Sequence, residues 1–252
     1  LCYKKLNMKR KNLNVVKLRD IYIRDKKIAE IYFKLKLILS KNKKNNSFVA
    51  AISGGPDSMA LAFLAKVISI EKKIRGYFIL VDHQIRKDSE REALEVKKIL
   101  KSRNINLKII KNRKKINKNV QKTARDIRYE ILCNFCKKNK ANTLLTAHHK
   151  DDQIETFLIR LSRGSGVEGL SSMSQTSKLK HGVSLIRPFL DFNKKQLEYI
   201  SHKVFMKTIK DPSNKNKKFL RTNIRDLTRI LEAKGVKLDQ IISEISIYPT
   251  FF

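Results

Sequence analysis

Short apolar runs alternate with amphipathic segments from residue 48 onwards, and this alternation is the feature that most constrains the fold. Each run has the length of a buried strand, and the four runs occupy residues 48–52, 77–81, 107–110 and 143–147. We expect a helix after each run. Repeated strand–helix units predict an α/β fold with a parallel sheet flanked by helices on both faces. Binding sites in such folds lie at the carboxyl ends of the strands.

The predicted helices that follow the four runs end near Ile70, Arg103, Phe135 and Arg163. The second of them is expected to begin with a capping box, in which the side chains of Ser89 and Glu92 bond each other's backbone. Helical apolar spacing also marks residues 26–40, ahead of the first strand.

Beyond Gly164 the pattern changes. A Gly/Ser-rich loop leads to a short predicted strand at 183–186, and helices are expected at 194–205 and 219–233. We therefore expect three parts: a basic N-terminal arm and helix at 1–46, the α/β domain at 47–215, and a small, basic, helical C-terminal extension at 216–252.

The chain is strongly basic, with 57 Lys and Arg residues against 23 Asp and Glu and a formal net charge of +34. Such a charge makes a polyanion, and nucleic acid first, the partner to consider. Richness in Lys, Asn and Ile is also what an A+T-biased genome would produce without selection for binding. No stretch approaches about 18 consecutive apolar residues, so we expect no membrane span.

Three cysteines, Cys2, Cys133 and Cys136, are too few for a disulfide framework in 252 residues, which favours a reducing compartment. The N-terminus has no secretory signal pattern. It begins at Leu1, so the true start is open, as is an organellar targeting segment. We expect a cytoplasmic protein in a bacterium, or the interior of a mitochondrion or plastid.

The segment Ser53-Gly54-Gly55-Pro56-Asp57-Ser58 joins the first predicted strand to a helix. Glycines let the backbone approach a ligand closely, and free N–H groups at the helix start can bind phosphate oxygens. Ser53 and Ser58 add hydroxyl groups, and Asp57 offers a carboxylate to a metal ion. The segment lacks the Lys-Ser/Thr ending of a Walker loop. The alternative is a plain strand–helix turn with a capping residue.

This loop resembles the SGGxDS pyrophosphate-binding loop (PP-loop) of the N-type ATP pyrophosphatases, which have an adenine nucleotide alpha hydrolase-like fold. In order and spacing, the further motifs resemble those of the tRNA(Ile)-lysidine synthetases over about residues 48–225. These motifs are Val81-Asp82-His83, Ala124–Tyr129 (ARDIRY), Ala147–Thr156 (AHHKDDQIET), Leu161–Gly166 (LSRGSG), Gly169-Leu170, Arg187–Leu190 (RPFL), Asp211–Asn214 (DPSN) and Phe219–Arg225 (FLRTNIR).

The resemblance implies a ligase that uses ATP and Mg²⁺. It would adenylate the C2 carbonyl of the wobble cytidine in the CAU anticodon of tRNA(Ile). The ε-amine of free L-lysine would then displace AMP, giving lysidine and changing codon reading from AUG to AUA and identity from Met to Ile. Pyrophosphate and AMP would be released.

The resemblance also implies roles for individual residues. The 53–58 backbone would hold ATP, and Asp57 would hold Mg²⁺ and pyrophosphate. Asp152 would organise lysine or the cytidine-adenylate, unless it only caps a helix together with Glu155. Arg125 or Arg128 would contact phosphate or the tRNA backbone, unless both lie on a solvated helix face.

Three other patterns have plainer interpretations. The segment 164–169 matches GxGxxG, but it follows a helix, whereas a dinucleotide fingerprint follows a strand. The pairs His148-His149 and Asp151-Asp152 lack the spacing of a helical zinc motif. Cys133 and Cys136, a CxxC inside a predicted helix, are expected to be a buried pair.

Two alternative functions stay open at this stage. One is a related PP-loop tRNA thiolase of the 2-thiocytidine type, for which Cys2 would be the only third cysteine ligand. The other is a non-catalytic basic RNA-binding relative, which would bind tRNA and turn over no nucleotide.

The chain ends 27 residues after Arg225, so we expect the further C-terminal domains of bacterial members to be absent or severely reduced. Cations at 26–44 and 219–229 are expected to supply sequence-independent grip on tRNA. A homodimer is possible in principle, and the sequence gives no oligomeric state.

Overall fold

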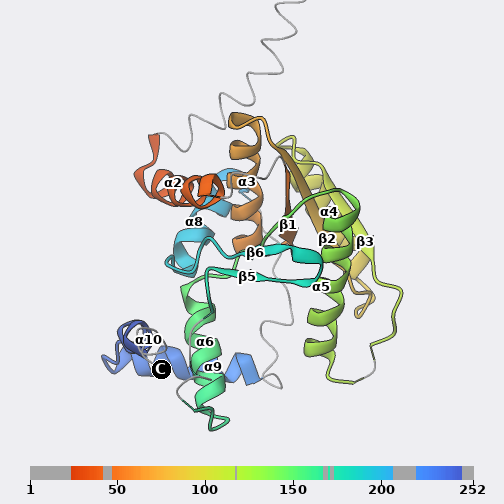
Figure 1. Cartoon of the computed structure of the whole chain (residues 1–252). Helices are drawn as coiled ribbons and strands as arrows, with labels where there is room; N and C mark the ends of the chain where they lie inside the picture. The colour runs from red at the N-terminus through yellow and green to blue at the C-terminus, as the bar shows by residue number, and fades with distance from the viewer. Residues whose placement is uncertain are drawn as a thin grey trace, which may run out of the picture.

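A six-stranded sheet forms the centre of the protein, with strand order β3-β2-β1-β4-β6-β5 (Figure 1). The computed structural model describes residues 24–41, 47–116, 118–166, 170, 173–206 and 220–245. Neighbouring strands run parallel except β5, which pairs antiparallel with β6. The strands are β1 (Ser47–Ile52), β2 (Arg75–Asp82), β3 (Leu107–Lys111), β4 (Thr143–Leu145), β5 (Thr176–Lys178) and β6 (Ser184–Ile186).

Helices connect and cover these strands. They are α2 (Lys26–Lys41), α3 (Pro56–Glu71), α4 (Ser89–Lys101), α5 (Val120–Lys138), α6 (Lys150–Leu161), α8 (Lys194–Phe205), α9 (Leu220–Ala233) and α10 (Leu238–Ile245), with a single 3-10 turn, η1, at Lys180–Gly182. Of the helices in these described ranges, none is long and apolar enough to cross a membrane.

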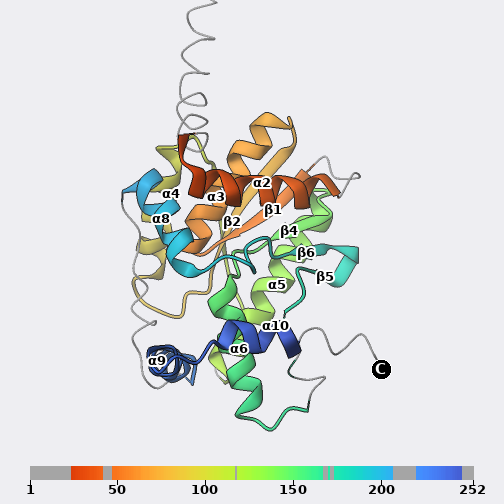
Figure 2. The same cartoon turned by 90° about the vertical axis from the view of Figure 1, so that its left-hand side faces the viewer.

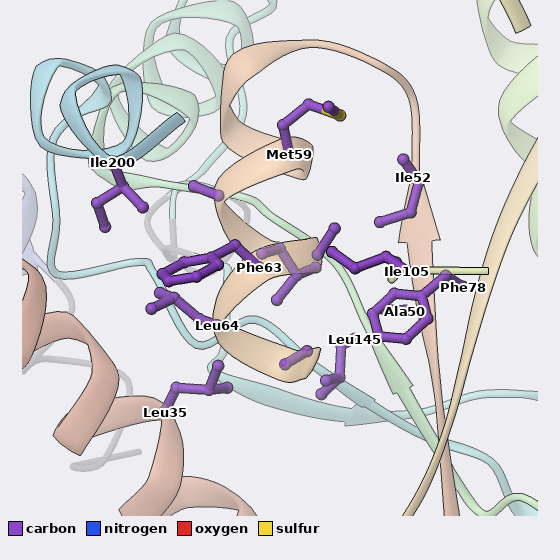
Figure 3. Close-up of a cluster of buried hydrophobic side chains, with 14 of the residues drawn as sticks. Leu35, Ala50, Ile52, Met59, Phe63, Leu64, Phe78, Ile105, Leu145 and Ile200 are labelled. Atoms are coloured by element: carbon purple, nitrogen blue, oxygen red, sulfur yellow. The ribbon is translucent and has the colours of Figure 1, made fainter. Parts of the chain in front are cut away.

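Alternate residues of β1 enter two different cores, as the two-residue period of a strand requires. Phe48, Ala50 and Ile52 pack with α2, α3, α4 and α8. Figure 3 shows this core, with Phe63 and Leu64 of α3 between the sheet and the neighbouring helices. Val49 faces the opposite way and packs against α5. The sheet is therefore buried on both faces, as the strand–helix pattern predicts.

A third, smaller core lies away from the sheet, where α6, α9 and α10 pack together (Figures 1 and 2). Phe157 and Leu158 of α6 meet Ile224 of α9 and Ile242 of α10. The connection between α8 and α9 lies outside the described residues. Helix α6 therefore belongs to two parts of the molecule, because it starts at the sheet and ends in this helical cluster.

The strand order reverses beside β1. Strand β2 follows β1 in sequence and pairs on one side of it, whereas β4 pairs on the other side. The loops that leave the carboxyl ends of β1 and β4 therefore diverge, and ligands of open α/β sheets bind in the crevice at such a reversal. These two loops begin at Ser53 and Thr146, inside two of the motifs found in the sequence.

The predicted α/β class, the parallel sheet and its flanking helices are confirmed. Three described elements were not predicted: edge strand β5, whose sequence Thr-Ser-Lys has no apolar alternation, the 3-10 turn η1 and helix α10. The boundary expected at residues 215 and 216, and the DPSN motif near it, lie outside the described residues. The three-part division of the chain stays a prediction.

The predicted capping box of α4 is wrong. The helix begins one residue earlier than that motif requires, with Asp88 at the N-cap and no side-chain cap hydrogen bond. The carboxylate of Glu92 instead accepts a hydrogen bond from Arg86 at 2.7 Å. A charged partner within reach outcompetes the backbone N–H that the motif would have offered.

Helix α2 is joined to α8 by Asp25, the residue just before α2. Its carboxylate accepts hydrogen bonds from Lys203 and from the Tyr199 hydroxyl, the latter at 2.6 Å. Burial opposes ionisation of this carboxyl group. The bonds from Lys203, Tyr199 and the backbone N–H of Ile28 outweigh that effect and lower the pKa of Asp25 to about 2.

We predict that Asp25→Asn lowers the free energy of unfolding by about 1 kcal/mol at pH 6. Because the folded-state pKa lies below the ordinary value of 3.8, this stabilisation is complete above about pH 4 and is lost as the pH falls towards 2. Urea denaturation at pH 6, 4 and 2.5 measures it. Asp191→Asn, which removes an exposed ion pair to Lys34 of the same helix, is the control. A difference between wild type and Asp25→Asn that is equal at all three pH values would contradict the assignment.

Candidate active site

The loop after β1 is folded tightly around the hydroxyl group of Ser58. This oxygen accepts the backbone N–H groups of Ser53 and Gly54, both at 3.1 Å, and donates to the carbonyl of Gly55 at 2.9 Å. In this structure the Ser58 hydroxyl therefore shapes the loop from inside. Pro56 starts α3, and the unpaired N–H groups of any first helical turn point outward from here.

Gly54 is required by the backbone at the centre of this loop. Its φ is +90°, a region that side chains rarely adopt, and a Cβ there would lie 2.5 Å from Cγ2 of Val96. Gly55, by contrast, has φ −69° and serves as the N-cap of α3. The first glycine thus lets the loop turn directly against α4.

Asp57, in the first turn of α3, meets the start of α6 across the strand-order reversal. Its Oδ2 lies 3.6 Å from Nε2 of His149, and Oδ2 of Asp152 lies 3.5 Å from the same nitrogen. Asp152 also accepts the backbone N–H of His149 at 3.1 Å. Two carboxylates from different helices thus converge on one buried imidazole.

The His149 side chain is only 6% exposed. Burial by itself would lower the pKa of His149, because it disfavours the charged ring. The interaction with Asp57 and the negative charges of Asp152 and Asp151 outweigh burial, so the pKa of His149 is raised above its ordinary value. A protonated His149 offsets the repulsion between the two carboxylates.

Helix α9 adds a second cation to this region. Arg225 binds Glu155, one turn beyond Asp152 on α6, with Nε–Oε1 at 2.5 Å and Nη2–Oε2 at 3.4 Å. Burial of the Arg225 side chain lowers its pKa. The bond to Glu155 and the charges of Glu155, Asp152 and Asp57 prevail, and the pKa of Arg225 is raised. The helical cluster therefore contributes directly to the electrostatics of the site.

Two cavities open on either side of the 53–58 loop. The larger, about 300 Å³, lies between that loop, the end of β2 at Asp82 and His83, and α4. The smaller, about 150 Å³, is lined by Asp57, Tyr129, Thr146 and His148. Both cavities share Ser53 and Arg128 as walls. A molecule bound in the larger cavity could therefore reach past the loop and contact a second molecule bound in the smaller cavity.

Arg125 and Arg128 do not lie on a solvated helix face. Both are half-buried beside the ring of Tyr129, with their guanidinium carbons 5.1 and 5.9 Å from its centre. Buried Arg187 lies at the same tyrosine from the end of β6 and donates to the carbonyl of Ser174 at 2.8 Å. Three guanidinium groups thus surround one phenol ring on the wall of the smaller cavity.

Asp57 fits a magnesium ion. Its Oδ1 is buried and has no hydrogen-bond partner, so an oxygen suited to a hard cation is left over at the loop. In the described part of the chain, no group of three or more His, Cys, Asp or Glu residues could hold a metal ion. Magnesium needs no such cage, because it binds through one or two carboxylates together with substrate phosphates.

Cys133 and Cys136 are buried in α5 and pack with Leu144 and Leu185 of the sheet. Burial raises the pKa of both thiols, that of Cys136 to about 12. They are core residues, as expected from the sequence. Cys2, residues 167–169 of the GxGxxG match and residues 211–214 lie outside the described residues.

The structure brings Asp57 and Asp152 together at His149. The sequence alone could not show this, because their proximity depends on the order of the strands in the sheet. Asp152 does cap α6, but not together with Glu155. It is the third residue of the helix and forms a capping box with His149, whose backbone N–H it accepts, while Glu155 binds Arg225.

His149 belongs to the AHHKDDQIET motif, but the sequence suggests no role for it beyond the metal pattern of His148-His149 and Asp151-Asp152. Its neighbouring acidic residues in the sequence were the available signal, but the contact with Asp57 is tertiary.

We predict that Gly54→Ala destabilises the protein by about 1–3 kcal/mol, because both the positive φ and Val96 oppose a side chain. ATP binding should weaken by about tenfold or more if the strain moves the loop. Gly182→Ala is the matched control, since Gly182 has φ +70° but nothing within 4 Å of the new Cβ. Urea denaturation and equilibrium ATP binding measure both. Equal effects of the two substitutions would argue against the close approach to α4.

We predict that Arg225→Ala loosens α9, because it removes the ion pair that joins α9 to the buried Glu155 carboxylate of α6. The local stability of α9 should fall by about 2–3 kcal/mol. Hydrogen exchange of the α9 backbone amides measures this loss. Arg229→Ala, which removes an exposed pair with Asp226 in the same helix, should leave exchange unchanged.

The sequence of this chain is similar to those of several known proteins. A family model described as a PP-loop domain matches residues 26–231. A tRNA(Ile)-lysidine synthase from Wolbachia pipientis wMel is 39% identical over 200 residues, which are 78% of this chain and 46% of that protein. A tRNA(Ile)-lysidine synthase from Bradyrhizobium diazoefficiens is 36% identical over 203 residues, 79% of this chain and 56% of that protein. The chain spans about half the length of the curated relatives it matches.

Among solved structures, the fold is similar to that of the U34-tRNA thiolase NcsA from Methanococcus maripaludis with its 4Fe–4S cluster. The TM-score is 0.72 at 20% identity, covering 90% of this chain and 80% of that one. At this identity the likeness concerns the fold. The family match over residues 26–231, together with the loop at 53–58, shows that the chain belongs to the PP-loop domain family.

Proposed function

We propose that this chain carries the catalytic domain of an ATP-dependent tRNA(Ile)-lysidine synthase. The observation that carries the proposal is the convergence of Asp57, which lines the smaller cavity beside the PP-loop, and Asp152 on His149. Relatives named tRNA(Ile)-lysidine synthase at 36–39% identity support the same activity. Because these relatives are bacterial, the site of action we favour is a bacterial cytoplasm.

The larger cavity suits the adenosine of ATP. It lies against the glycine-rich loop and the end of β2, so a nucleotide there would direct its phosphates towards the backbone of residues 53–58. Outward N–H groups of the loop and of the first turn of α3 would hold the β- and γ-phosphates. Magnesium on Asp57, when bound, would neutralise the negative charge of the departing pyrophosphate.

The smaller cavity suits the target base. Asp57, Arg128 and Tyr129 line it, so a base seated there would lie next to the α-phosphate of ATP. The C2 carbonyl oxygen of cytidine would attack the α-phosphorus, and the bond to pyrophosphate would break. Adenylation turns an unreactive, amide-like carbon into an electrophile with AMP as its leaving group.

The second step needs a neutral amine. The ε-nitrogen of L-lysine would form the new bond to C2, AMP would leave with the oxygen, and the nitrogen would lose one proton to solvent. Asp152, which meets His149 beside Asp57, is the residue we propose to orient the lysine or the adenylate. Arg125 and Arg128, gathered at Tyr129, are proposed to contact phosphate.

The thiolase alternative finds no support in the described cysteines. Cys133 and Cys136 are protonated core residues of α5 on the sheet, and thiolate is the form that sulfur transfer and cluster ligation need. A protein that only bound RNA would not need the buried, unpartnered oxygen of Asp57. Ligation remains the function that the site supports best.

We predict that the protein, mixed with ATP, Mg²⁺, labelled L-lysine and total tRNA, transfers lysine to one isoleucine tRNA and releases AMP and pyrophosphate. Asp57→Asn should lower this incorporation by about 100- to 1,000-fold, because a charge at the reacting phosphates is removed. Affinity for tRNA should be unchanged. Acid-precipitable label, nucleotide chromatography and filter binding give the three readouts.

The matched control is Asp191→Asn, which removes a carboxylate from the protein surface and should leave incorporation at the wild-type level. Release of ADP in place of AMP, or no lysine in any tRNA, would refute the proposal. Loss of tRNA binding in Asp57→Asn would mean that the loop contacts RNA and not the phosphates of ATP.

A further inference from the structure

A third hollow continues the larger cavity along the same edge of the sheet. It measures about 370 Å³ and lies where β2 and β3 end side by side, at the paired residues Asp82 and Lys111. His83, Gln84 and Ile85 line both this hollow and the larger cavity. The two hollows therefore adjoin at these three residues, and we call them together the trench.

The outer wall of this trench is a basic segment, residues 111–116, held firmly in place. The backbone N–H of Asn112 donates to the carbonyl of Asp82 at 2.7 Å. The buried Asn112 side chain donates to the carbonyl of Lys114 at 2.7 Å and accepts its N–H at 2.9 Å. The cations that follow Asn112 are thus presented by a structured turn.

Part of this positive charge is neutralised and part is not. Lys111 pairs with Glu90, and Lys114 pairs with Glu130, both at 2.7 Å. Arg113 and Lys115 are exposed and line the hollow, and neither has an ion-pair partner among the residues that the structure describes. Two uncompensated cations therefore face the open end of the trench.

Apolar side chains accompany these cations. Ile85, which is 51% exposed, and half-buried Ile116 line the same hollow. A surface that combines unpaired cations with exposed apolar groups in a groove matches single-stranded nucleic acid, which offers phosphates on one side and base faces on the other. A free nucleotide would already be held at the PP-loop, at the other end of the trench.

We propose that Arg113 and Lys115 bind backbone phosphates of the RNA loop that presents the target base, and that the trench leads this loop to the nucleotide site. The inference rests on the proposed function for the identity of the RNA. The surface itself is argued from the trench and its charges. Each cation would contact one phosphate, with Ile85 packing against a neighbouring base.

The test is the double substitution Arg113→Ala, Lys115→Ala, with filter binding of an anticodon stem-loop RNA of CAU sequence over a series of salt concentrations. We expect affinity to fall about tenfold or more at low salt, and the log–log salt slope to shrink by about 1.4–1.8 for two lost phosphate contacts. ATP affinity should be unchanged, because neither residue lines the larger cavity.

The matched control is Lys137→Ala, Lys138→Ala. These exposed lysines lie at the end of α5, and Lys140 just beyond them accepts a hydrogen bond from Ser47 at the start of β1, so they lie at the amino ends of the strands. Their substitution removes the same charge. Equal losses in both double variants would overturn the proposal, because they would reflect net charge alone. Unchanged RNA binding in the Arg113, Lys115 variant would also overturn it. If the alanine variant does not fold, Arg113→Gln, Lys115→Gln repeats the test.

Lysine incorporation by the unsubstituted protein, measured in parallel, separates this inference from the proposed function. RNA binding that depends on Arg113 and Lys115 supports the surface even if no lysine is incorporated. Lysine incorporation with RNA binding independent of both residues keeps the ligase and removes the surface. If the Arg113, Lys115 double variant lost retention on anionic vesicles while its RNA affinity stayed unchanged, the partner of the two cations would be a membrane, and the inference would be overturned.

Discussion

The site depends on one constraint of the fold, the pairing of β4 beside β1 on the side away from β2. This pairing sends the loops after the two strands apart and opens a crevice between the first turn of α3 and the first turn of α6. Asp57 comes from one helix, and His149 and Asp152 come from the other. No segment of the sequence contains this cluster, because only the sheet order assembles it.

Holding two carboxylates together inside a protein requires compensating positive charge. The raised pKa of His149 favours a positive charge at short range, and Arg225 supplies one from α9 through Glu155. Arg128, at the ring of Tyr129, lines the smaller cavity together with Asp57. The site therefore holds many charged side chains of both signs. One oxygen of Asp57 has no hydrogen-bond partner and is left for a ligand.

Much of this protein could be predicted from its sequence, for reasons that differ between elements. The four buried strands and the loop at 53–58 could be found, because apolar runs and glycines carry their own local signal. Edge strand β5 could not, since its sequence has no apolar alternation and its pairing with β6 is a contact between segments of the folded chain. Asp57 and Asp152 were candidates from their motifs. The roles of His149 and Arg225 depend on contacts between residues far apart in the chain, to which sequence spacing gives no access.

The Arg225–Glu155 pair has a thermodynamic consequence. The negative charges of Asp152 and Asp57, as well as Glu155, raise the pKa of Arg225. The free energy that holds α9 on α6 therefore depends on the charge of the site. A ligand that changes the charge at Asp57 or Asp152 must change how strongly α9 is held. By reciprocity, anything that presses α9 onto α6 must change the affinity of the site for that ligand by the same factor.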